Sequence, residues 1–183
     1  MLIRSIALFV HIVAMLGLFV GLALEWLSLE SLQRSHPAQA ASAIAVLRAL
    51  PRYMAGAVGL IFVSGVYLAV RVGVFDLGWV RVSLGSMVVM GILGGPVIRS
   101  QMRAVLRAGD ENAQGGVPSS VRRDASHPLL RASLRTRVAV GLAIVYLMIG
   151  KPDLGESLLL IGAALAVGAA TSVPLAARLS RQA

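Results

Sequence analysis

The sequence contains no cysteine and little charge. Without cysteine there is no disulfide framework, thiolate metal site, iron–sulfur cluster or cysteine nucleophile. Only 14% of the 183 residues are charged, against roughly 25% in a soluble domain, and Lys151 is the sole lysine. The motifs HExxH, GxxxxGK(S/T) and GxSxG are absent, and no carboxylates are spaced for a metal or phosphate site. We therefore assign no catalytic residue and no metal ligand, and we favour a function without enzymatic chemistry.

Long uncharged runs dominate what is present. Apolar residues make up 57% of the chain, and the charged residues gather in short blocks between these runs. Ser5 to Leu24 is a run of about twenty residues, which as a helix matches a hydrocarbon core of about 30 Å. We predict an all-α integral membrane protein, a bundle of about five transmembrane helices in one domain over residues 1–183. The predicted spans are residues 5–26, 53–71, 79–98, 133–150 and 156–177.

The fourth span is the least regular. Val138 to Gly150 is uncharged over only about thirteen residues, or about 20 Å of helix. A helix that begins near Leu129 supplies the missing length if its arginines extend to the headgroups and the local bilayer thins. These arginines are Arg131, Arg135 and Arg137. The alternative is four spans plus a re-entrant or interfacial helix.

The basic residues predict the orientation. With the N-terminus outside, thirteen of the 17 lie on the inner side, mostly in or beside the predicted cytoplasmic loop 99–132. Arg4, Arg71, Arg81 and Lys151 lie outside. The positive-inside rule then places the C-terminus in the cytoplasm, for a protein of the bacterial inner (plasma) membrane. The net charge of +9 suits anionic lipid headgroups, and because it flanks apolar segments we expect no nucleic acid partner.

Two further cytoplasmic segments have contrasting composition. Ala38 to Leu50 suits a helix whose arginines lie at an anionic surface. Residues 109–126 are polar and contain glycine, proline and serine, which is typical of a flexible loop. His36 and His127 each precede a proline, a pattern that favours a role at the start of a helix over metal ligation.

The first span carries three ionisable residues on one stripe. Arg4, His11 and Glu25 are separated by multiples of seven residues, and with Leu18 they follow a line that drifts only about 20° per heptad. An ionisable group facing lipid costs several kcal/mol. The stripe is therefore predicted to face protein or water.

His11 has two interpretations, both open. It is the only histidine within a span, and the hydroxyl groups of Tyr67 and Tyr146 lie at similar depth. In the first interpretation a hydrogen bond from His11 to one of these hydroxyls ties two helices together. In the second, His11 is an axial haem ligand or a proton carrier, because haem needs only one proximal histidine.

Glu25 and Lys151 occupy opposite ends of the predicted bundle. Glu25 lies beside Trp26 at the inner boundary, as an interfacial charge or as a partner of Arg99. Lys151 ends the shortest span and lines either the mouth of a cavity above His11 or an ordinary solvated rim. No second carboxylate lies within the spans, so a complete proton path is not visible.

Two pairs of glycines match the pattern that lets membrane helices approach closely. They are Gly17 with Gly21 and Gly91 with Gly95. The pairs favour packing within the bundle, with a homo-oligomer through either pair as the alternative.

The first span also resembles a known group of membrane proteins. Val10 to Met15, with Gly17 and Gly21, is similar to the opening helix of the copper-resistance D and HemJ-type protoporphyrinogen oxidase families. The rest, notably Lys151 to Leu154, resembles multi-span bacterial membrane proteins of unknown function. By the HemJ-type resemblance, His11 is the candidate haem ligand.

Three functions fit these observations. The leading one is a small membrane protein in a scaffold or assembly role. Small-solute permeation along the stripe of the first span is the second. A haem-binding redox protein that uses His11 is the alternative from a different class.

Overall fold

The chain folds into a bundle of helices without strands over the residues described. The computed structural model describes residues 2–34, 37–94, 103 and 127–170. Its helices are α1 (Leu2–Arg34), α2 (Pro37–Val72), α3 (Gly78–Gly94), α6 (Pro128–Gly150) and α7 (Leu154–Ala170). By length and composition α1, α2 and α6 can each cross a membrane, and α3 and α7 are shorter apolar helices. The predicted all-α membrane fold is confirmed.

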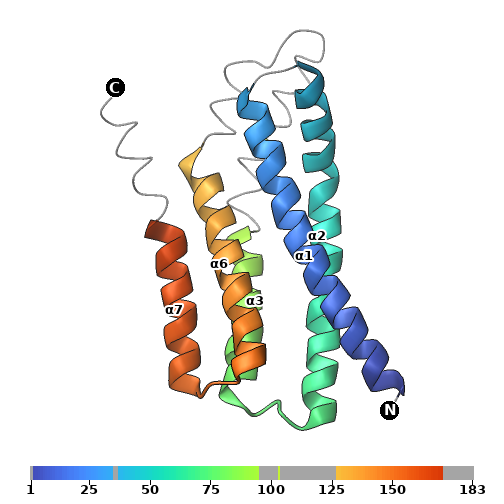
Figure 1. Ribbon diagram of the computed structural model, residues 1–183, viewed down its shortest axis with the longest axis vertical. Helices are drawn as coiled ribbons and strands as arrows, with labels where there is room; N and C mark the ends of the chain where they lie inside the picture. The colour runs from blue at the N-terminus through green and yellow to red at the C-terminus, as the bar shows by residue number, and fades with distance from the viewer. Residues whose placement is uncertain (1, 35–36, 95–102, 104–126, 171–183) are drawn as a thin grey trace.

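The helices alternate in direction (Figure 1). The N-terminus, the α2–α3 connection and the α6–α7 turn lie at one end, and the last turn of α1 and the first turn of α2 lie at the other. Helix α1 packs mainly on α2, while α6 packs on α7 and α3. Fewer contacts, between α1 and α6 and between α2 and α3, join these two groups.

Helix α6 begins where hydrophobic length requires. It starts at Pro128, one residue before the expected Leu129, and its 23 residues give about 35 Å of helix. His127 is the N-cap, with its Nδ1 accepting a hydrogen bond from the backbone N–H of Leu129 at 3.3 Å. The helix-start role predicted for His127 is confirmed, whereas His36 lies outside the described residues.

The first two helices are longer than a bilayer is thick. Helix α1 has 33 residues and α2 has 36, or about 50 and 54 Å, against a hydrocarbon core of about 30 Å. Helix α2 continues through Pro51, so the separate surface helix expected at Ala38 to Leu50 is the first part of a single helix. Four leucines at this end of α1 and α2 are buried. They are Leu29 and Leu32 of α1 and Leu47 and Leu50 of α2.

The turn between α6 and α7 depends on two polar residues. Lys151 adopts the left-handed conformation, with φ 48° and ψ 48°, and its N–H donates to the carbonyl of Leu147 at 2.9 Å. The side chain of Asp153 then accepts a hydrogen bond from the N–H of Glu156 at 2.8 Å and caps α7. Lys151 itself is exposed.

Glycines set the closest helix contacts. A Cβ at Gly21 would lie 2.3 Å from Sδ of Met54 on α2, and the carbonyl of Gly17 accepts a hydrogen bond from Tyr53 at 2.9 Å. This pair is thus occupied inside the chain, as the packing interpretation predicts. A Cβ at Gly168 would lie 2.5 Å from Cα of Thr136, which brings α7 against the backbone of α6.

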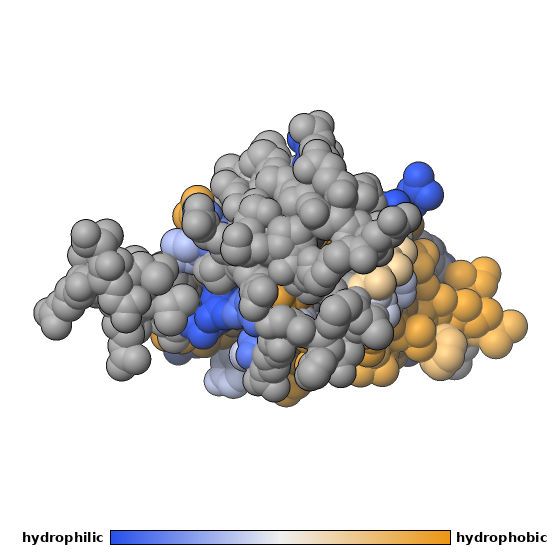
Figure 2. All heavy atoms as spheres, turned by 90° about the horizontal axis from the view of Figure 1, so that it is seen from above, coloured by the Kyte–Doolittle hydropathy of each residue, from blue (hydrophilic) through white to orange (hydrophobic). Residues whose placement is uncertain are grey.

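The remaining apolar surface faces outward. Viewed from the end of the α1–α2 connection, hydrophobic side chains cover much of one flank of the bundle (Figure 2). Ile3, Phe9 and Leu16 of α1 and Leu159 of α7 are all more than half exposed. In a membrane protein this surface contacts lipid chains.

Several sequence predictions fall on residues that the structure does not describe. They are Arg99, Gly95, the loop at 109–126 and the last part of the fifth predicted span, 171–177.

Candidate functional site on the buried stripe of α1

The predicted stripe of α1 faces the protein interior along most of its length. His11 and Glu25 are 6% and 4% exposed, and Leu18 between them is buried. Leu32, one heptad further, is also buried, whereas Arg4 at the other end is exposed. The titratable groups of the stripe inside the bundle are therefore His11 and Glu25, about 21 Å apart along the helix axis.

His11 links α1 to α2. Its Nδ1 lies 3.0 Å from Oγ of Ser64 and 3.1 Å from the carbonyl oxygen of Ile61. A carbonyl oxygen can only accept, so Nδ1 carries the hydrogen and, in the neutral ring, Nε2 carries the lone pair. The Ser64 hydroxyl donates in turn to the carbonyl of Leu60, one turn earlier on α2. These contacts provide partners for Nδ1 of a polar ring buried among apolar side chains.

A glycine makes room for this ring. A Cβ at Gly65 would lie 3.1 Å from Cε1 of His11 and 3.5 Å from its Nδ1. The pair Ser64-Gly65 therefore supplies an acceptor and open space at adjacent positions of α2.

Glu25 links α1 to α6. Its Oε1 accepts a hydrogen bond from Nη2 of Arg137 at 2.5 Å, and the two side chains are 5% and 11% exposed. Nε of Arg137 also donates to the carbonyl of Ser133 at 3.4 Å. The buried partner of Glu25 is thus Arg137, an arginine that the sequence analysis assigned to the headgroups.

The space between the two polar contacts is filled by apolar side chains. Leu18 and Leu22 of α1 pack with Ile61 of α2, Met87 of α3 and Leu134 of α6 in one buried cluster. Leu22 is only 2% exposed. In the described part of the chain, His11 and Glu25 are therefore separated by packed hydrocarbon.

The other predicted site residues lie apart from His11. Tyr67 is half-buried on α2 and Tyr146 is 58% exposed on α6. The hydrogen-bond partners of His11 are thus Ser64 and Ile61 instead of either tyrosine. Arg4 in the first turn of α1 and Lys151 in the α6–α7 turn are exposed. Among the residues described, no cluster of three metal-ligating side chains is found.

Sequence reasoning missed Ser64 and the pairing of Arg137. A small polar residue followed by glycine at the depth of His11 was a usable signal for Ser64. The pairing of Arg137 had no local signal, because its partner lies 112 residues away in the sequence.

The comparisons with known proteins agree with this architecture. The family described as "Predicted integral membrane protein (DUF2269)" matches residues 5–152, which include His11, Glu25 and the whole of α2 and α6. The chain belongs to this family. Comparisons of this DUF2269 protein with curated proteins and with solved structures find no match. The resemblance to the copper-resistance D and HemJ-type families stays a prediction.

Proposed function

We propose that this DUF2269 protein is a non-catalytic membrane scaffold. The observation that carries the proposal is that α1 and α2 run on together beyond the thickness of a bilayer. We call this extension the projecting hairpin, residues 25–34 of α1 and 37–52 of α2. Four of its leucines are buried, and its α1 part is held to the start of α6 by the hydrogen bond from Arg131 to Gln33, so it is anchored on the bundle. An anchored element outside the membrane suits the binding of another protein.

The chemistry of the stripe supports the same proposal. His11 and Glu25 each make a contact between helices, which is what a scaffold requires of buried polar residues. The permeation hypothesis has less support, because Leu18 and Leu22 fill the space between these two residues.

Photo-crosslinking tests the scaffold role. A photoreactive amino acid at the exposed Ala45 of the projecting hairpin should give a discrete protein adduct in cells. The matched control carries the photoreactive amino acid in place of Leu159, which is 76% exposed on α7 and faces lipid. The adduct at position 45 should disappear when Leu47→Glu disrupts the hairpin. Equal patterns at positions 45 and 159 would overturn the scaffold proposal.

The projecting hairpin lies on the cytoplasmic side of the bacterial inner membrane in this proposal. The support is the excess of arginine at this end, which also favours binding of anionic headgroups. Because the chain has no native cysteine, single cysteines at Asp153 and Gln114 can be labelled in intact cells. Labelling at Asp153 and protection at Gln114 is the expected result, and the reverse pattern contradicts the orientation.

Haem binding by His11 is the second candidate function, and one observation favours it. Metal-bound histidines commonly donate their other ring N–H to a backbone carbonyl, as Nδ1 of His11 does to Ile61. The protein purified in detergent should then show a Soret band, alone or after haem is added. His11→Ala should abolish the band, while Ser64→Ala, which retains the ring, should keep it. A preparation without a Soret band under both conditions removes this candidate.

A further inference from the structure

A pocket lies where α1 leaves the predicted membrane region. It is lined by seven residues of α1 and α6, and we call it the arginine pocket. The residues are Trp26, Leu29, Glu30, Gln33, Arg131, Leu134 and Arg135. The space between them is about 60 Å³, room for about two water molecules.

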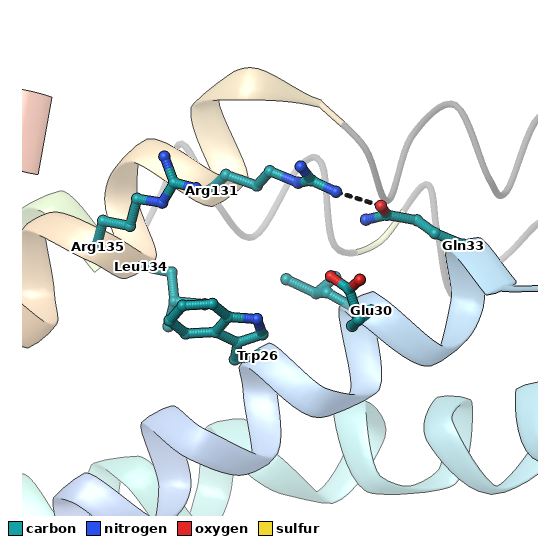
Figure 3. Close-up of a pocket in the computed structure, with 7 residues that line it drawn as sticks. Trp26, Glu30, Gln33, Arg131, Leu134 and Arg135 are labelled. Carbon is teal, nitrogen blue, oxygen red and sulfur yellow. Dashed lines mark hydrogen bonds between the residues drawn. The ribbon is translucent and has the colours of Figure 1, made fainter. Parts of the chain in front are cut away.

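Two arginines approach the pocket from one helix. Arg131 and Arg135 lie four residues apart on α6 and both line the pocket; the Arg131 side chain extends across to Gln33 of α1, while that of Arg135 extends along α6 beside Arg131 (Figure 3). Arg131 donates a hydrogen bond to Oε1 of Gln33. A guanidinium group has five N–H donors, so this bond leaves Arg131 able to donate to a ligand.

The charge and position of the pocket define its ligand. Two guanidinium groups and one carboxylate give a net charge of +1, and the positive end of the α6 dipole adds to it. Trp26 is half exposed beside the pocket, and tryptophan is typical of the headgroup level of a bilayer. The half-exposed Trp26 suits the glycerol backbone of a lipid whose phosphate lies at the arginines.

We propose that the arginine pocket binds the phosphodiester of a singly anionic glycerophospholipid, such as phosphatidylglycerol. The paired N–H donors of an arginine guanidinium group match the spacing of two phosphate oxygens. The single negative charge of this headgroup balances the net charge of the pocket. Glu30 disfavours a dianionic phosphate monoester. This site is a specific case of the headgroup binding in the proposed function, and it rests on that proposal for its place at the membrane surface.

Lipid titration of the full-length protein in detergent tests the site. We expect Arg131→Gln/Arg135→Gln to weaken phosphatidylglycerol binding at least tenfold in native mass spectrometry. Arg48→Gln/Arg52→Gln removes the same charge from exposed positions of the projecting hairpin and should weaken binding much less than the pocket variant, because it removes only general headgroup attraction at this end. Equal losses in the two variants would overturn the pocket while leaving general headgroup binding intact, and no binding by the unaltered protein would overturn both.

Two further binding measurements identify the ligand. Phosphatidylcholine should bind at least tenfold more weakly, and inorganic phosphate in hundredfold excess should not displace the lipid. Equal binding of phosphatidylcholine, or displacement by phosphate, would overturn the proposal.

Because Arg131 also contacts α1, Arg135→Gln alone serves as a second variant, with helix content checked by circular dichroism. Phosphatidylglycerol should raise the Tm of the unaltered protein and of the hairpin variant more than that of Arg135→Gln, and equal shifts in all three would contradict the site.

Discussion

Oε1 of Glu25 on α1 lies 2.5 Å from Nη2 of Arg137 on α6, with both side chains almost fully buried. This ion pair joins the α1–α2 pair to the group of α3, α6 and α7, between which contacts are few. Its effect on stability is therefore expected to exceed that of an ordinary surface pair.

Removing one member of this pair should destabilise the bundle strongly. Glu25→Gln leaves the Arg137 guanidinium buried without its counter-charge, which typically costs about 3–5 kcal/mol. Unfolding in SDS, followed by tryptophan fluorescence, measures the change. The exchange Glu25→Arg/Arg137→Glu should recover part of the loss. Asp76→Asn is the control, because it breaks the exposed pair with Arg81 and should cost no more than about 1 kcal/mol. Equal losses from Glu25→Gln and Asp76→Asn would contradict this assignment.

The contact between His11 and Ser64 should contribute less to the free energy of unfolding than the Glu25–Arg137 ion pair does. Ser64→Ala removes one of the two acceptors of Nδ1 and should lower the free energy of unfolding by about 0.6–1.7 kcal/mol, as for other hydrogen bonds between membrane helices. His11→Ala should lower it further, because it also removes the ring that packs on Gly65. The same SDS titration gives both values, and a larger loss for Ser64→Ala than for His11→Ala would disagree with the structure.

Gly168 and Gly162 form a matched pair on α7. Alanine at 168 would place a Cβ 2.5 Å from the Cα of Thr136, so α6 and α7 must separate. Alanine at 162 meets no atom within 4 Å. We expect Gly168→Ala to lower the free energy of unfolding by about 1–3 kcal/mol, as in overpacked cores, and so to lower the Tm. Gly162→Ala should leave the Tm unchanged or raise it. The prediction fails if the two variants melt together.

Lys151→Gly should be neutral or stabilising. The left-handed conformation of Lys151 costs roughly 1 kcal/mol for a residue with a Cβ, and glycine adopts it freely. Thermal unfolding of the purified protein measures the effect, and Lys151→Gln separates the loss of charge from the change of backbone. A marked loss of stability in Lys151→Gly alone would mean that the lysine side chain has a structural role that its exposure does not indicate.

The elements predicted best were those set by hydrophobic length and heptad spacing. The need for a bilayer-spanning helix placed the start of α6 near Leu129, and the spacing of His11 and Glu25 placed both on a buried face. The continuity of α2 was missed because Pro51 is ordinarily a helix boundary. Here α2 has interior side chains on both sides of Pro51, the buried Leu47 and Leu50 before it and the partly buried Met54, which packs on Gly21 of α1, after it.

The partners of the polar residues were harder to predict. The packing of α6 beside α1 brings Arg137 to Glu25, and no local feature of the sequence indicates this packing. Serine at position 64 was one of several small polar residues in the spans. Its selection by His11 depends on the register between α1 and α2, which Gly17, Gly21 and their contacts on α2 determine.

The distance in sequence between Glu25 and Arg137 also has a consequence for biosynthesis. Arg137 follows Glu25 by 112 residues, so at about 5–20 residues per second the ribosome delivers it roughly 6–20 s later. Ser64 and Ile61, whose oxygens accept from His11, are translated before α3, so the contact between α1 and α2 can form within that interval. Until α6 has been synthesised, the carboxylate of Glu25 lacks the cation that it pairs with in the folded protein.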